Sequence, residues 1–224
     1  YRVIDPATGS PRPAHYGDIA VLSKTNKNVQ TVAAALRCGS VPWATQQSGL
    51  LSTPEAVLAL ACLRRLNDPW DTLASAEILS LADCEEPESW LADRLRYLER
   101  GGDSGLWRDE ATDGHPVLSR IAALRAQAPL LSPYAAMELV MVQCDLAGRV
   151  LRWRRDGLVA RVRLANLEAV LRLARSYEDA CLARREPATV PGLILWLGEQ
   201  AHEELDMLAE PPVAAVKVMT HHAA

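Results

Sequence analysis

Apolar and polar positions in the first 45 residues follow the patterns of alternating strand and helix. Residues 18–22 form a short β-branched run, which is typical of a buried strand. Four small or apolar residues then recur at helical spacing: Val29, Val32, Ala33 and Leu36. Residues 41–45 form a second extended segment. Strand, helix and strand in so few residues predict a βαβ unit whose two strands pair in parallel.

The pattern is helical from residue 52 to about residue 205. Ser52 and Glu55 have the spacing of a capping box and Pro54 suits a first turn, so we expect a helix to begin there. It should end before the Asn-Asp-Pro sequence at 67–69, because proline disfavours a helical residue before it. Further helices are expected at residues 71–81, 87–100, 116–127, 133–146, 160–184 and 190–205.

The pattern changes again after the two prolines at 211–212. Residues 213–219, Val-Ala-Ala-Val-Lys-Val-Met, predict one more buried strand. The chain is therefore expected to be α/β, with a large helical insertion between elements of one partial parallel sheet. We divide it at 1–66 and 211–224 for the α/β part and at 67–210 for the helical part.

Charge excludes a protein that is basic all over its surface. The 24 Lys and Arg residues are outnumbered by 28 Asp and Glu residues, which gives a net charge of −4. A local basic track remains compatible with this balance. One dense stretch contains Arg149, Arg152, Arg154, Arg155, Arg161 and Arg163. It could contact duplex DNA through phosphates in a salt-sensitive manner, and the alternative is a solvated surface paired with nearby acids.

Cysteine usage and hydropathy bear on the compartment. The five cysteines show no Cys-x-x-Cys or metal-ligand spacing, so we expect free thiols in a reducing cytoplasm and no metal site. No apolar run approaches the roughly 18–20 residues of a membrane span, so no membrane partner is expected. The sequence begins with Tyr1, and we expect it to be a piece of a longer protein.

Candidate functional residues follow the last predicted strand. Thr220, His221 and His222 come directly after it, and ligands in open α/β sheets gather beyond the carboxyl ends of the strands. The alternative is an ordinary chain end without a role.

Several stretches resemble motifs of one family. Residues 216–224, Val-Lys-Val-Met-Thr-His-His-Ala-Ala, resemble the start of motif V in the UvrD/Rep group of superfamily 1 helicases, and residues 18–26 are similar to motif IV. Other stretches resemble the segment that enters the inserted domain of this group, or fit the same lineage, and they lie at 50–56, 63–71, 163–167 and 192–197. The Leu-Arg-Arg-Leu-Asn-Asp-Pro-Trp-Asp run at 63–71 resembles the AddA- and RecB-like helicase–nuclease subunits most. The resemblance covers almost the whole chain.

The resemblance implies a fold and roles for single residues. The first and last segments would belong to the second RecA-like motor domain, which is P-loop NTPase-like, and the helices to its inserted 2B-type domain. Lys24 stands where motif IV carries an Arg that approaches nucleotide phosphates. Lysine keeps the charge but lacks the forked geometry, and the alternative is a solvated lysine. Thr220 and His222 match motif V residues that line the single-stranded DNA path, whereas His221 occupies a variable position.

A complete motor is not expected in these residues. The chain has no Gly-x-x-x-x-Gly-Lys-Ser/Thr phosphate loop, and by the family pattern the carboxylates that hold Mg²⁺ are absent as well. We therefore expect ATP and Mg²⁺ to be cofactors of the intact parent helicase, and the isolated chain to hydrolyse no ATP.

Partners follow from the same resemblance. Those expected are single-stranded and duplex DNA, an upstream first RecA-like domain, and a partner subunit of a helicase–nuclease complex in DNA repair and recombination. Whether a nuclease domain follows stays open. The alternative is a degenerate, non-catalytic helicase domain that serves as a protein-interaction scaffold, which Lys24 in place of Arg favours.

Overall fold

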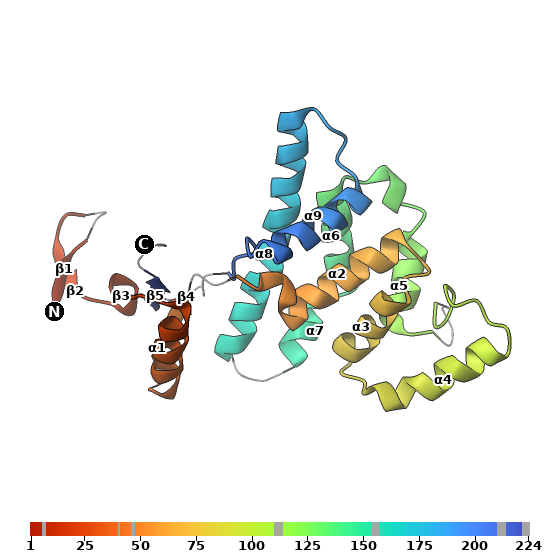
Figure 1. The fold of residues 1–224 in the computed structure, drawn as a ribbon, viewed down its shortest axis with the longest axis horizontal. Coiled ribbons are helices and arrows are strands. Elements are labelled where there is room, and N and C mark those ends of the chain that lie inside the picture. The colour runs from red at the N-terminus through yellow and green to blue at the C-terminus, as the bar shows by residue number, and fades with distance from the viewer. Residues whose placement is uncertain are drawn as a thin grey trace. The chain divides into compact units, whose positions relative to one another are not determined.

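The chain forms two compact units in the computed structural model. An α/β unit comprises Tyr1–Ser48 and Met207–Ala224, and a helical unit comprises Gly49–Asp206 (Figure 1). The structure describes residues 1–5, 8–39, 41–45, 48–109, 114–153, 157–209 and 214–220. The units divide at 48/49 and 206/207, whereas the sequence suggested 66/67 and 210/211.

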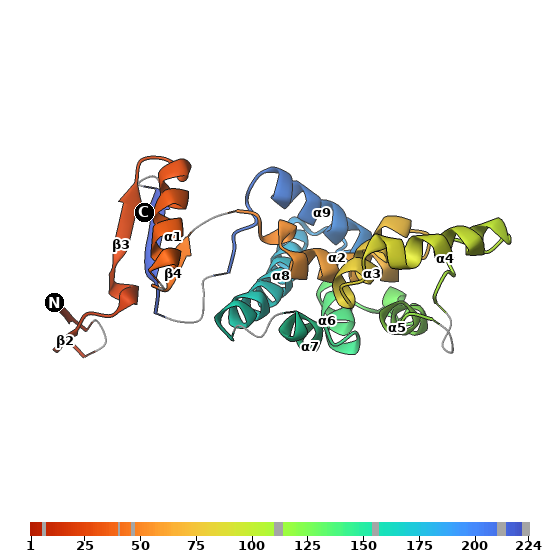
Figure 2. The ribbon, with the colours of Figure 1, turned by 90° about the horizontal axis from the view of Figure 1, so that it is seen from below.

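A three-stranded parallel sheet organises the α/β unit. It consists of β3 (Ala20–Ser23), β5 (Val216–Thr220) and β4 (Trp43–Thr45), in that spatial order (Figure 2). In the register of β3 and β5, Val21 lies opposite Val218 and Ser23 lies opposite Thr220. The prediction that the opening and closing stretches of the chain share one parallel sheet is therefore confirmed.

The predicted direct pairing of the first two strands is wrong. β5 lies between β3 and β4 and pairs with both. Val216 and Val218 of β5 are buried, so this apolar strand takes the central position. The short spacing of β3 and β4 in sequence gave no sign of a third strand between them.

Helix α1 (Asn26–Cys38) covers one face of this sheet (Figure 2). Val29 and Ala33 are buried, and Val29 packs with Val216 and Val218 in one apolar cluster. The helical face predicted from apolar spacing is confirmed.

An antiparallel hairpin near the N-terminus was not predicted. It joins β1 (Arg2–Ile4) to β2 (Pro11–Pro13), and the prolines of β2 gave no strand signal. The chain then makes a 3₁₀ turn at Tyr16–Asp18, so the expected strand begins at residue 20 instead of 18. Arg12 Nη1 lies 2.6 Å from Asp18 Oδ2, and this hydrogen bond holds the pKa of Asp18 well below its usual range.

The helical unit is built around one buried helix. In chain order it contains η2 (Leu50–Ser52), α2 (Pro54–Asn67), α3 (Thr72–Ala82), α4 (Pro87–Glu99), α5 (Pro116–Leu124), η3 (Ala128–Leu130), α6 (Pro133–Gln143), α7 (Leu146–Arg152), α8 (Gly157–Arg184) and α9 (Val190–His202). α2 packs against α3, α5, α6, α8 and α9 (Figure 1). For this reason α2 lies in the helical unit and not, as expected, in the α/β part.

The start of α2 corrects a local prediction. Its N-cap is Thr53, and no side chain forms the expected capping box. Glu55 is buried instead, and its Oε1 accepts a hydrogen bond of 2.7 Å from Asn166 Nδ2 on α8. A contact between distant helices has thus replaced the local cap.

The helix expected at 133–146 ends earlier, and a second helix that was not predicted follows it as α7. α6 ends at Gln143, and Asp145 adopts a left-handed conformation with φ of 50°. The Asp145 carboxylate then accepts from the Gly148 N–H at 3.2 Å and so caps the start of α7.

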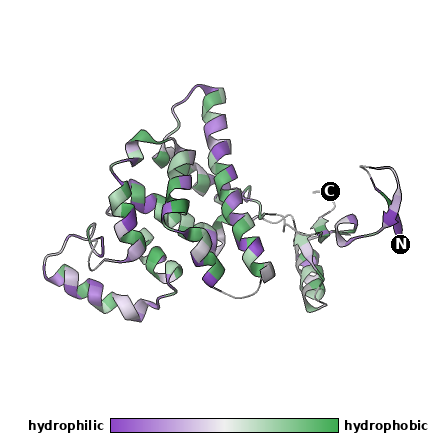
Figure 3. Cartoon of the chain, turned by 180° about the vertical axis from the view of Figure 1, so that it is seen from behind, coloured by the Kyte–Doolittle hydropathy of each residue, from purple (hydrophilic) through white to green (hydrophobic). Residues whose placement is uncertain are grey.

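Among the described residues no helix is both long and apolar enough to cross a membrane. All five cysteines are free, and Cys62, Cys144 and Cys181 are buried. Figure 3 shows polar and apolar residues interleaved along the helices, as amphipathic packing requires.

Candidate functional site

The carboxyl edge of the parallel sheet brings together two of the predicted site residues. Ser23 ends β3 and lies opposite Thr220, the last described residue of β5. Lys24 follows Ser23, so Lys24 and Thr220 occupy the same edge although they are far apart in sequence. α1 begins two residues later, at Asn26, which adds a helix N-terminus to this edge.

This edge offers an ammonium group and hydroxyl groups beside the start of a helix. Lys24 is exposed, and within the described part of the chain it has no ion-pair partner. Thr220 is half-buried at the end of the central strand. Thr25 Oγ1 accepts from the Asn28 N–H at 3.3 Å at the start of α1. An ammonium group, a hydroxyl and a helix N-terminus together suit the oxygens of a phosphate, although the edge supplies no carboxylate for Mg²⁺ among the described residues.

Three predicted site residues fall outside the described part of the chain. His222, together with its neighbour His221, follows the last described strand residue. Arg154 and Arg155 lie between α7 and α8, in the gap at 154–156. Their predicted roles in DNA binding stay predictions.

Two arginines of the basic stretch are engaged in internal contacts. Arg149 Nη1 lies 2.6 Å from Asp83 Oδ1. Arg163 Nε lies 3.9 Å from Glu55 Oε2, and its guanidinium stands 5.1 Å from the centre of the Trp153 ring. These two side chains stabilise the helical unit, so the alternative of pairing with acids applies to them.

Two other arginines of the stretch remain accessible. The Arg152 side chain is 64% exposed, and its Nη1 lies 3.5 Å from Asp145 Oδ2. Such an exposed pair contributes little free energy and yields easily to a phosphate. Arg161 is exposed on the first turns of α8. The described basic surface therefore reduces to Arg152 and Arg161.

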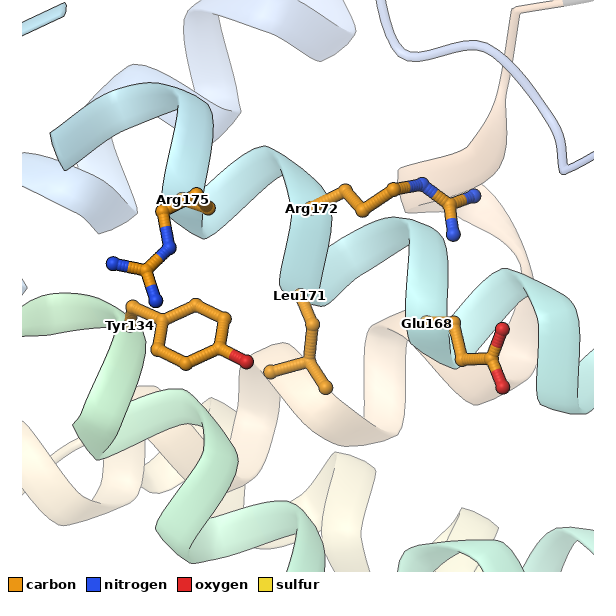
Figure 4. Close-up of a pocket in the computed structure, with 5 residues that line it drawn as sticks. All are labelled: Tyr134, Glu168, Leu171, Arg172 and Arg175. Carbon is orange, nitrogen blue, oxygen red and sulfur yellow. The ribbon is translucent and has the colours of Figure 1, made fainter. Parts of the chain in front are cut away.

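An open pocket of about 330 Å³ lies between α6 and α8 (Figure 4). The Arg175 guanidinium stands 4.2 Å from the centre of the Tyr134 ring, and Glu178 accepts from Arg175 Nη1 at 3.3 Å. Figure 4 shows Arg172 and Glu168 extending away from Tyr134. Because Arg175 already covers the ring and the charges are mixed, this pocket is a poor place for a nucleobase to stack.

The Leu-Arg-Arg-Leu-Asn-Asp-Pro-Trp-Asp run has a structural role. Arg64 pairs with Asp71 through two hydrogen bonds of 2.8 and 2.9 Å and also reaches Glu77 at 3.0 Å. Asp71 caps α3 by accepting from the Ala74 N–H at 2.8 Å. The run therefore fixes the turn from α2 to α3.

Arg65 of the same run is the buried charge that sequence reasoning missed. Its side chain is fully buried, and its Nη1 donates to the Pro69 carbonyl. Its Nη2 donates to the Gly105 carbonyl at 2.7 Å and to Asp109 Oδ1 at 2.9 Å. Burial lowers the pKa of Arg65, Asp109 raises it, and the charge of Arg125 lowers it again. The Arg-Arg pair itself carried no signal of which arginine would be buried.

Asp83 is used for packing within the helical unit as well. Asp83 Oδ2 lies 2.8 Å from His115 Nε2, and His115 Nδ1 accepts from the Val117 N–H at 3.3 Å. Burial lowers the pKa of His115, which favours the neutral ring that this acceptor role requires. Among the described residues no three His, Cys, Asp or Glu side chains are grouped to hold a metal ion.

Comparisons with known proteins add no family. No protein-family model matches the chain, and no curated protein matches it either. The resemblance to helicases therefore rests on the motifs of the sequence, and the strands that carry two of these motifs pair in one sheet.

Proposed function

We propose that the chain is part of an ATP-dependent DNA helicase of the UvrD/Rep type, similar to the AddA- and RecB-like subunits that act in DNA repair and recombination. In this proposal the α/β unit is part of the second RecA-like domain and the helical unit is its 2B-type insertion. One observation carries the proposal. β3 and β5 pair in parallel, so the residues that resemble motifs IV and V meet at one sheet edge.

Lys24 and Thr220 would act on different phosphates. The Lys24 ammonium is a compact point charge suited to neutralising a nucleotide phosphate that approaches the edge from another domain. The Thr220 hydroxyl can donate to a backbone phosphate of single-stranded DNA, which positions the strand without reading its sequence. ATP with Mg²⁺ would supply the free energy of translocation, and the phosphate loop would come from outside these 224 residues.

The helical unit would contact duplex DNA only locally. It carries 18 arginines against 25 acidic residues, so its overall charge repels a polyanion. Arg152 and Arg161 are the described exceptions on the basic stretch. A contact confined to this stretch would be sensitive to salt.

Single-stranded DNA binding tests the sheet edge. We expect the chain to bind a fluorescent oligothymidine, with Lys24→Ala weakening binding and reducing the slope of log affinity against log salt by about 0.7. Thr220→Val should weaken binding without changing that slope, because it removes a hydrogen bond and no charge. Anisotropy titrations at low and moderate salt measure both quantities.

Lys217→Ala is the matched control, since Lys217 is exposed near the start of β5, away from the carboxyl edge. It should lower the slope less than Lys24→Ala. Equal effects of the two lysine variants, or no effect of either, would remove the sheet edge from the DNA path.

Charge reversal tests the basic stretch. Replacing Arg152, Arg154 and Arg155 with Glu should weaken duplex binding at low salt by about tenfold or more, because phosphate contacts dominate such affinity. A control with equal net charge replaces Arg96, Arg100 and Arg184, which are exposed on α4, just after it, and at the end of α8. Unchanged affinity of the first variant, or an equal loss in the control, would contradict the contact.

A non-catalytic scaffold is the second candidate. Lys24, in place of the expected Arg, favours it, because lysine cannot form the forked contact to a phosphate. Under this function the Lys24 and Thr220 variants should bind DNA as the unaltered chain does.

A further inference from the structure

Two arginines of the helical unit share one carboxylate, and a third arginine lies over a nearby aromatic ring. Arg65 Nη2 and Arg125 Nη1 donate to the two oxygens of Asp109 at 2.9 and 2.8 Å. The Arg94 guanidinium stands 4.8 Å from the centre of the Trp107 ring, and Trp107 precedes Asp109 by two residues. Among these four charged groups, two positive charges are not balanced.

Several nitrogens of this cluster lack acceptors. Arg65 Nε, Arg94 Nη1, and both Nε and Nη2 of Arg125 are buried and have no hydrogen-bond partner within the described part of the chain. Because these atoms are shielded from solvent, bulk water does not replace the missing acceptors. A buried cationic donor without an acceptor is costly, and a bound ion is one way in which proteins satisfy it.

We propose that Arg65, Arg94 and Arg125 form a binding site for a phosphate oxyanion, either the free ion or a terminal phosphomonoester. A phosphate carries about −1.5 to −2 charges at neutral pH, which matches the excess in the cluster. Its oxygens suit the planar forks of several guanidinium groups at once. A single carboxylate, in contrast, would leave half of the charge unbalanced.

The three arginines would have different roles in binding the ion. Arg65 is fully buried and fixed by the Pro69 and Gly105 carbonyls, so it would form the floor of the site. The side chains of Arg94 and Arg125 are only partly buried, so they can rotate to admit the ion and then close on it.

Inorganic phosphate is the probe for a first experiment on the full chain. Thermal unfolding and isothermal titration are carried out with phosphate replacing chloride at constant ionic strength and pH. We expect a heat of binding that saturates in the titration, and a midpoint that rises by several degrees with the logarithm of the phosphate concentration. Excluded-ion stabilisation, in contrast, would give no saturable heat and would raise the midpoint equally in every variant.

Variants assign the binding to the cluster. Arg125→Gln should weaken phosphate binding at least tenfold, as expected when one partner of a hydrogen-bonded charge pair is truncated. Arg94→Gln is the second variant, because Arg94 makes no hydrogen bond to Asp109 in the structure and its loss should leave the fold intact. Arg96→Gln, at an exposed position of α4, should bind phosphate as the unaltered chain does. Equal affinity in Arg94→Gln and Arg96→Gln would overturn the proposal, as would the absence of saturable binding.

Two further arms separate the possible sources of the phosphate. An oligothymidine with a 5′-phosphate should compete with inorganic phosphate if the site takes a phosphomonoester, and failure to compete would assign the site to the free ion. Equal competition by the oligonucleotide without a 5′-phosphate would overturn the proposal, since phosphodiesters would then suffice.

Asp93 directly precedes Arg94 and is engaged by Trp107 Nε1 and Arg108 Nε, each at 3.3 Å. The acids that follow Asp109 in sequence are Glu110 and Asp113, which lie outside the described residues. Binding seen only after Glu110→Gln with Asp113→Asn would overturn the proposal for the natural sequence.

Discussion

Replacing Arg65 with Met should lower the free energy of unfolding of the helical unit by about 3–5 kcal/mol, the usual effect of breaking a buried ion pair from one side. Asp109, whose side chain is 5% exposed, would keep Arg125 as its partner and lose the stronger anchor. The carbonyls of Pro69 and Gly105 would lose their donors as well. Urea unfolding followed by circular dichroism measures the change.

Arg64 provides the control, because it precedes Arg65 on the same helix. Its side chain is 24% exposed and pairs with Asp71 and Glu77 near the surface. Arg64→Met should therefore cost about 1 kcal/mol or less. Arg65→Lys should fall between the two, since one ammonium keeps the charge and cannot reach all three acceptors. Equal losses at positions 64 and 65 would show that burial of Arg65 does not govern the stability of the helical unit.

Local sequence patterns predicted the helices and strands themselves better than they predicted which of them lie side by side. The spacing of Val29, Val32, Ala33 and Leu36 was enough to predict α1, because one apolar face decides where a helix packs. The place of β5 between β3 and β4 was not predictable, since the strands that meet there lie at opposite ends of the chain. Local spacing has no access to such pairings.

The predictions of side-chain roles at these positions were wrong for a similar reason. Glu55 had the spacing of a capping residue, and only the fold brings Asn166 within 2.7 Å to bind it instead. Arg149 belonged to a basic stretch, and its partner Asp83 is remote in sequence. The shared position of Lys24 and Thr220 was predictable. Lys24 directly follows one strand and Thr220 ends another, and parallel strands place such positions at one edge.

Gly192 is a position where even a methyl group should be harmful. A Cβ added there would overlap the hydroxyl of Tyr177, which belongs to α8 and packs beside Trp196 with ring centroids 5.8 Å apart. Gly192→Ala must displace Tyr177, and overpacking of this kind costs about 1–3 kcal/mol. The better helix propensity of alanine, about 1 kcal/mol, offsets part of this. We expect a net loss of up to about 2 kcal/mol in urea unfolding.

The same helix contains a control that isolates the contact. A Cβ at Gly198 of α9 would meet nothing within 4 Å, so Gly198→Ala should gain about 0.5–1 kcal/mol from propensity alone. Tyr177→Phe removes the overlapping hydroxyl, so Gly192→Ala should cost less in that background, and the difference is the coupling between the two positions. If Gly192→Ala stabilised the chain as much as Gly198→Ala does, α8 and α9 would have to pack without the close approach of Gly192 to Tyr177.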